Sequence, residues 1–225
     1  MIRLERQDFV FDESQPPYFV DSVSSHQFGK KIKLNDVYAS GNYQLLEFQN
    51  GFYAYSSNYI MHEDFDLDLS VPKESFLALH INQIQAGVEF NFQLNNASVS
   101  YDDKIITSLF LTTPEDSFRL RGSSGACINR LKIMIPRMWL QEQLPFFDDA
   151  LLQRYLHLQH KRLLIDTIDS TYRTLVNKVM NTEDNECYLT VTQDIVTVIT
   201  ERFFSRLHHK LMKNLEDQDW SDRLP

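Results

Sequence analysis

The stretch LKIMIPRMWLQEQLP, residues 131–145, divides the chain into two parts with different hydrophobic patterns. Before Pro136 the apolar residues alternate mostly with a period of two, which is typical of half-buried β-strands. After Pro136 they recur with the three- and four-residue spacing of amphipathic helices. Proline is well tolerated in the first turn of a helix, because its missing N–H has no intrahelical acceptor there. The sequence therefore predicts a β-rich part up to residue 135 and a helical part after it.

The β-rich part predicts about eight short strands between residues 43 and 135, at the even spacing of an antiparallel sandwich or barrel. Asn50-Gly51 lies between two apolar runs and is a strong signal for a β-hairpin. Segment 76–81 is apolar on both faces, which predicts a central strand. Segment 88–94 alternates cleanly and predicts a strand with one buried face.

The helical part predicts a short helix up to Pro145, a second helix that starts at residues 148–149, and two longer helices. The third carries an apolar face from Leu164 to Met180 and the fourth from Val191 to Leu211, which together form an antiparallel hairpin. The adjacent Phe203 and Phe204 suggest more apolar surface than one sheet face needs. Either the last helix only covers the sheet, or it also pairs two subunits. For the second case we predict a dimer interface made by Ile195, Val198, Ile199, Arg202, Phe203 and Leu207.

Composition excludes several classes of protein. The 225 residues are 43 % hydrophobic, which is ordinary globular composition. The net charge of −9 gives no basic face for DNA phosphates. No stretch approaches the roughly 20 apolar residues that cross a bilayer, and the charged N-terminus does not resemble a signal peptide. Cys127 and Cys187 belong to no CxxC pair, so we expect free thiols and a cytoplasmic protein.

Few residues point to chemistry. His62 and Asp64 could share a metal, but the alternation of residues 62–68 is also that of a solvated strand face, so we predict no metal site. His80 lies inside an apolar strand, where a pocket-lining or core histidine is the simplest interpretation. Arg119 and Arg121 share one face of a strand and could hold an anion if that face points inward. No nucleophile elbow or phosphate loop is present, so we predict no catalytic residue and no cofactor.

Residues 108–145, SLFLTTPEDSFRLRGSSGACINRLKIMIPRMWLQEQLP, resemble the end of the N-terminal domain of AraC-type transcription regulators. In that family a strand, a proline-containing turn and further strands lead to an apolar strand and a short helix. Segment 76–94, with Gly87 midway, is similar to the strand–Gly–strand hairpin of cupin-like barrels. The resemblance covers roughly residues 40–210 and concerns the layout. Metal-binding cupins carry two His one residue apart, and both His62-Glu63-Asp64 and His80-Ile81-Asn82 lack the second His.

The resemblance implies a mainly β fold with a helical C-terminal part. Residues 1–135 would form a cupin-like antiparallel barrel, or jelly roll, that binds a small-molecule effector. Residues 136–225 would form a helical linker that pairs two chains as a homodimer. DNA would be bound only through a C-terminal domain with helix-turn-helix motifs that this chain lacks, so we expect a shortened chain or a natural stand-alone sensor. The residues predicted to line the pocket are Ala78, His80, Phe90, Phe92 and Arg119.

Two other functions stay open. A metal-independent cupin-like isomerase or lyase would use His80 and a nearby carboxylate as acid and base, and its mark would be a buried His–carboxylate pair. A stand-alone dimerisation domain would fill the barrel with its own Phe and Tyr side chains.

Overall fold

The chain is described here by a computed structural model. It describes residues 2–4, 20–26, 29–34, 36–68, 76–85, 90–94, 97–101, 105–144, 149–162, 168–180 and 186–221. Within these ranges the chain forms twelve strands and four helices: β1 Ile2–Leu4, β2 Val20–His26, β3 Gly29–Leu34, β4 Ala39–Glu47, β5 Tyr53–Met61, β6 Phe65–Asp68, β7 Phe76–Gln85, β8 Phe90–Leu94, β9 Ala97–Tyr101, β10 Ile105–Thr112, β11 Phe118–Gly122, β12 Cys127–Pro136, α1 Arg137–Gln143, α2 Asp149–Arg162, α3 Ser170–Met180 and α4 Glu186–Ser221.

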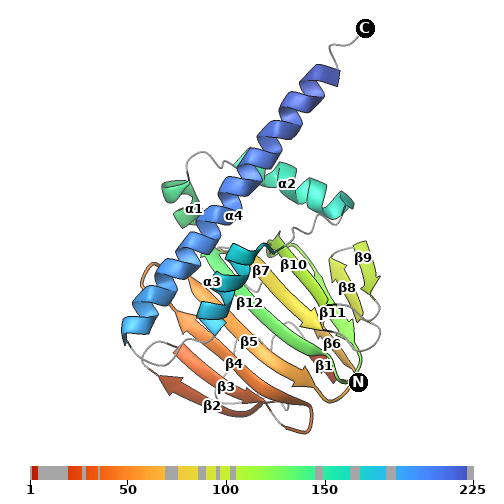
Figure 1. Cartoon of the computed structure of the whole chain (residues 1–225), viewed down its shortest axis with the longest axis vertical. Helices are drawn as coiled ribbons and strands as arrows, with labels where there is room; N and C mark the ends of the chain where they lie inside the picture. Colours follow the sequence, from red (N-terminus) through yellow and green to blue (C-terminus); the bar gives the residue numbers. More distant parts are fainter. Residues whose placement is uncertain are drawn as a thin grey trace.

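The strands form two sheets (Figure 1). The larger has the order β10-β7-β12-β5-β4-β3-β2, and the smaller has the order β1-β6-β11-β8-β9. The strand pairings in the described residues are antiparallel, except that β1 and β6 run parallel. A mainly β fold with a helical C-terminal part is thus confirmed.

The closed barrel is not confirmed. In the described residues no strand pairing joins one sheet to the other. Alternating hydrophobicity predicts a strand and its buried face, but it does not specify which sheet edges meet. The antiparallel β-sheets are therefore confirmed, whereas the described residues form two sheets that are not closed into a barrel.

The hairpin predicted at Asn50-Gly51 joins β4 to β5. Phe48 N donates to Phe52 O and Gly51 N donates to Phe48 O, both over 3.0 Å. Gly51 has φ +81°, a conformation that favours glycine. Gly41 is a second required glycine, because a Cβ at this position would lie 2.2 Å from the carbonyl oxygen of Asn58.

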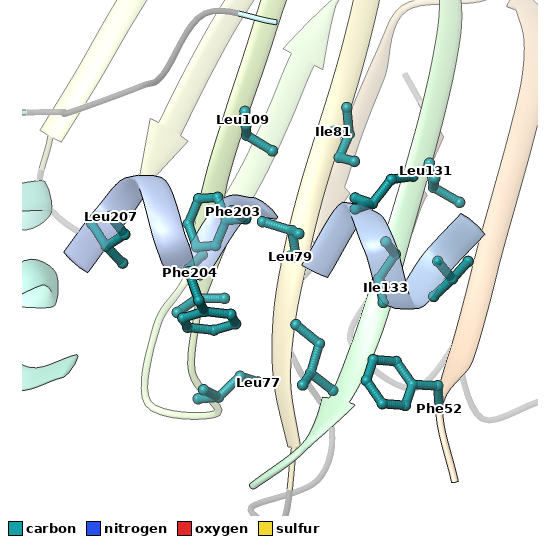
Figure 2. Close-up of a cluster of buried hydrophobic side chains, with 14 of the residues drawn as sticks. Phe52, Leu77, Leu79, Ile81, Leu109, Leu131, Ile133, Phe203, Phe204 and Leu207 are labelled. Atoms are coloured by element: carbon teal, nitrogen blue, oxygen red, sulfur yellow. The ribbon is translucent and has the colours of Figure 1, made fainter. Parts of the chain in front are cut away.

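The helices cover one face of the seven-stranded sheet, and α4 runs diagonally across it (Figure 1). Phe203 and Phe204 of α4 face Leu77 and Leu79 of β7 (Figure 2). Phe204 and both leucines have no exposed surface. One continuous cluster of buried apolar side chains therefore joins the sheet to α1, α2, α3 and α4.

The junction of α3 and α4 is organised by one carboxylate. Asp169 Oδ1 accepts the backbone N–H of Tyr172 over 3.0 Å and so caps the start of α3. Asp169 Oδ2 accepts from Arg202 and Arg206 of α4, both over 3.1 Å. The hydrogen bond from Tyr172 N is the largest cause that lowers the pKa of the Asp169 carboxyl. The start of α3 thus contacts the middle of α4, as expected for the predicted antiparallel hairpin, although the predicted helical residues 164–167 lie outside the described part.

The six residues predicted for a dimer interface divide into two groups. Three of them are buried in the core of the chain itself: Ile199, Phe203 and Leu207. Ile195 is half-buried, Val198 is 47 % exposed, and Arg202 binds Asp169 within the chain. The apolar character of Phe203 and Phe204 is explained by this internal packing and needs no second subunit. No helix in the described ranges is long and apolar enough to span a membrane.

Candidate ligand-binding site

The strands β7, β10 and β12 present two buried faces of opposite character. Leu79 of β7 packs under the helices, whereas the next residue, His80, contacts the smaller sheet. The His80 ring lies 4.9 Å from the ring of Phe118 in β11, edge to face. It also stacks on Phe110 of β10, with centroids 4.8 Å apart. We call the face that carries His80, Ser108, Phe110, Thr112, Asn82, Arg130 and Lys132 the inner face.

Hydrogen bonds fix the protonation state of His80. Nη2 of Arg130 lies 3.1 Å from Nδ1 of His80, and Nε2 lies 2.7 Å from Oγ1 of Thr112. A guanidinium can only donate, so Nδ1 must be an acceptor and the ring proton lies on Nε2. His80 is therefore a neutral imidazole that donates to Thr112. Burial, and then the charges of Arg130 and Lys132, lower the pKa of His80 well below its ordinary value of 6.5.

Arg130 is a buried cation whose guanidinium does not use all of its hydrogen-bond donors. It is 4 % exposed, and its Nε–H has no hydrogen-bond partner. Its guanidinium carbon lies 5.7 Å from the centroid of the Phe118 ring. No carboxylate of the described residues forms an ion pair with it. Burying an ion without a counter-charge costs on the order of several kcal/mol, so this arrangement is unfavourable for stability alone.

Lys132 adds a second positive charge to the inner face. It is 2 % exposed and lies directly opposite His80 in the pairing of β12 with β7. Its Nζ lies 5.8 Å from the centroid of the Tyr55 ring. Burial raises the pKa of Tyr55 to about 12, so this phenol stays neutral.

Polar groups continue along the inner face toward β10. Asn82 lies opposite Arg130 in the strand pairing and has no exposed surface. Its Nδ2 donates to Oγ of Ser108 over 2.9 Å, while its Oδ1 has no hydrogen-bond partner. Together with Arg130 Nε, this leaves one unused donor and one unused acceptor in the same row of the sheet. Buried polar groups normally have partners, so Asn82 Oδ1 and Arg130 Nε are exceptions on the inner face.

The structure brings some of the predicted pocket residues together and separates others. Ala78 and His80 lie on the inner face of β7. Phe90 and Phe92 pair in register with Gly122 and Leu120, but their side chains are outside the described part. Arg119 occupies the opposite face of β11 from Phe118, so it does not reach this cluster.

Sequence reasoning missed the two cations. The segment INRLKIMI of β12 was interpreted as one long apolar strand, although Arg130 and Lys132 alternate with Leu131 and Ile133. Two basic residues with a period of two inside a buried strand were the available signal. Nothing in the sequence indicated a role for Thr112. Its contact with His80 depends on the pairing of β10 with β7, which places Thr112 opposite Ala78, two residues from His80.

The histidine-and-carboxylate segment 62–68 has a structural role. His62 Nδ1–H donates to the Asp36 carbonyl over 2.8 Å, and Nε2 lies 3.0 Å from Ser40 Oγ. Asp64 accepts from the Ser124 backbone N–H over 3.1 Å. These bonds hold loops at one end of the sheets. In the described residues no group of three or more His, Cys, Asp or Glu side chains could hold a metal ion.

Comparisons with known proteins give little further information. No protein-family model matches the chain, and no curated protein matches its sequence. The chain is similar to a cupin domain of Cnp3 from Schizosaccharomyces pombe, with 9 % identity, a TM-score of 0.32, and coverage of 49 % of this chain and 74 % of that one. It is also similar to a predicted oxalate decarboxylase from Thermotoga maritima, with 16 % identity, a TM-score of 0.25, and coverage of 51 % and 98 %. Both TM-scores are below 0.5, so no assignment rests on these similarities.

Proposed function

We propose that this chain is the effector-binding and dimerisation domain of an AraC-type transcription regulator, with the effector held between the two sheets. The observation that carries the proposal is the buried, incompletely satisfied Arg130 on the inner face. A sheet interior that served stability alone would be filled with apolar side chains. Retaining a cation there costs stability, and a ligand that binds it offsets that cost.

The strands that carry the polar cluster also carry the contacts to α4. His80 is flanked in β7 by Leu79 and Ile81, and both belong to the apolar cluster under the helices. A ligand on the inner face that shifts β7 and β12 therefore acts on α4 through directly packed side chains. In this proposal, ligand binding favours one arrangement of α4, and that arrangement determines how attached DNA-binding domains are presented.

The dimer would form through the outer face of α4. Val191 and Val198 are 48 % and 47 % exposed, and the half-buried Ile195 lies between them at helical spacing. This short apolar stripe remains after the internal packing of Phe203 and Leu207 is accounted for. In this proposal the stripe takes the place of Ile199, Phe203 and Leu207, which were predicted for the interface but are buried within the chain.

The alternative functions have less support. An isomerase or lyase needed a buried pair of His80 and a carboxylate, but the hydrogen-bond partners of its ring are Arg130 and Thr112. Burial, and then the charge of Arg130, also lower the pKa of His80, which makes the imidazole a weaker base. A stand-alone dimerisation domain with a filled interior would need its own acidic group beside Arg130, and no described residue supplies one.

The test is retention of small molecules by the purified chain. The chain is mixed with a defined library of metabolites, separated by gel filtration, denatured, and the released compounds are identified by mass spectrometry. Sedimentation velocity then measures the oligomeric state with and without each retained compound. We expect at least one retained compound and a dimer whose stability depends on it. A chain that retains no compound would contradict the effector-binding function.

The regulatory part has a separate test. Reading the gene beyond codon 225 should show a continuing frame with two helix-turn-helix patterns. A stop codon at that point would contradict regulation through attached DNA-binding domains and would leave the ligand-binding result unaffected.

A further inference from the structure

Resting on the proposed effector site, we infer that the effector is a small organic acid whose carboxylate pairs with Arg130. Among the described side chains of the inner face, Arg130 and Lys132 are cations and His80 is a neutral imidazole. Arg130 has an unused Nε–H and no carboxylate partner among the described residues. A neutral effector would leave that charge buried without compensation, whereas an anion compensates it.

The guanidinium is held in place before any ligand arrives. Thr112 accepts from His80, and His80 accepts from Arg130. The His80 ring is itself fixed between Phe110, which stacks on it, and Phe118, which meets it edge to face. An anchor held in this way loses little conformational freedom on binding, which favours affinity for even a small ligand. His80 and Thr112 are thus positioning residues for Arg130.

The surroundings favour a carboxylate over a phosphate. Phosphate sites usually draw several backbone N–H groups from a loop or a helix N-terminus. β12 is paired on both sides, with β5 and with β7, so its backbone groups are already used in the ladder. Only side-chain donors remain, and one guanidinium edge matches one carboxylate in size, charge and geometry. The Phe118 and Tyr55 rings beside the two cations fit an apolar body on the same molecule.

The experiment measures thermal unfolding of the full chain against increasing acetate, with ionic strength held constant by sodium chloride. Acetamide is the neutral probe of nearly the same shape, and inorganic phosphate is the second anion. We expect acetate to raise the melting temperature with saturation and acetamide to leave it unchanged. Phosphate should need at least a tenfold higher concentration for half of its effect. Equal effects of acetate and acetamide, or none from acetate, would overturn the inference; a stronger effect of phosphate would overturn its carboxylate part.

Variants locate the site. Arg130→Met should raise the acetate concentration for half effect at least tenfold, because the anchor is removed while the volume is kept. Arg173→Met makes the same change at an exposed arginine on α3 and should alter it less than twofold. An acetate effect that survives in Arg130→Met would overturn the assignment to Arg130. If Arg130→Met does not fold, the comparison of acetate with acetamide on the unmodified chain still decides the ligand class.

Failure of the inference and failure of the proposed function give different results. If the retained metabolites are neutral and bind Arg130→Met equally well, the carboxylate inference fails and the effector-binding function stands. If no metabolite is retained and acetate has no effect, both fail.

Discussion

The two faces of β12 are both buried but contribute to the molecule in opposite ways. Leu131 and Ile133 point toward the helices and belong to the apolar cluster with α4. Arg130 and Lys132, which alternate with them, are 4 % and 2 % exposed on the inner face. Burial on the first face stabilises the fold by removing apolar surface from water. Burial of the Arg130 charge on the second face costs free energy, so burial alone does not show that a residue serves stability.

The same contrast holds in β7 and separates structural from functional positions. Leu77 and Leu79 fill space under Phe203 and Phe204 (Figure 2). His80 and Asn82 instead form a polar row with neighbouring strands. Substitutions on the helix-facing side should change stability most. Those on the inner side should change stability less and ligand binding more.

The largest effect is expected at Phe204, which has no exposed surface between α4 and the sheet. Phe204→Ala should lower the free energy of unfolding by about 3–5 kcal/mol, because it removes buried apolar surface and leaves a cavity. Urea unfolding followed by circular dichroism measures this loss. Met212→Ala, at a 41 % exposed position of the same helix, should stay within about 0.5 kcal/mol of the wild type. Equal losses in both variants would contradict the assignment of α4 to the core.

A smaller effect is expected from Thr112→Val on the inner face. The substitution keeps the shape but leaves Nε2–H of His80 buried without an acceptor, which should cost about 1–3 kcal/mol. Thr200→Val is the matched control, because Thr200 is equally buried and its hydroxyl only donates to the Val196 carbonyl in α4. We expect the control to cost less than Thr112→Val in the same urea experiment. The reverse order would show that the hydrogen bond to His80 is not made.

The pH dependence of stability tests the neutral state of His80. Its pKa is lowered well below 6.5 in the folded chain, first by burial. As the pH falls through 6.5 the unfolded chain therefore binds up to one more proton at His80 than the folded chain does, and stability falls as the pH falls. The slope from this residue is at most about 1.4 kcal/mol per pH unit. Unfolding free energies at pH 7.5 and 5.5 should differ by about 1 kcal/mol more in the wild type than in His80→Gln. An equal difference in both proteins would contradict the neutral, buried imidazole.

The smallest effect is expected at Asp169, between α3 and α4. Asp169→Asn keeps an oxygen that can cap α3 but removes the charge that Arg202 and Arg206 contact. These ion pairs are partly exposed, so the loss should be at most about 1 kcal/mol and should shrink in high salt. Urea unfolding at low and high sodium chloride measures it. A loss as large as that of Phe204→Ala would contradict the view that apolar packing dominates the helix-facing side.

Much of the fold was predictable because local patterns determine it. The hairpin at Asn50-Gly51 and the change to helices after Pro136 depend on turn chemistry and hydrophobic period, which are local in sequence. The order of the strands in the two sheets was not predictable, because strand partners are chosen by contacts that are distant along the chain. The strands β1, β2, β3 and β9 were missed altogether.

The candidate site was predictable only in part. Ala78 and His80 were assigned to the interior from the resemblance to a cupin-like barrel, and both side chains are fully buried. Arg119 was proposed as the anion partner from its neighbour Arg121, but it lies on the outer face of β11, and Arg121 instead binds Asp66 over 2.9 Å. A shift of one residue reverses the face, so a single strand cannot decide such a case. The pairing of β12 with β7, which places Arg130 beside His80, requires the structure.

The central claim is that the inner face around Arg130 binds a molecule that the chain does not itself provide. The most direct measurement is a crystal structure of the purified chain grown in the presence of acetate. The account predicts density for a carboxylate outside the polypeptide, about 3 Å from Nε of Arg130. A carboxylate of the chain's own residues bound to that nitrogen would contradict the account and would identify the interior as self-filled.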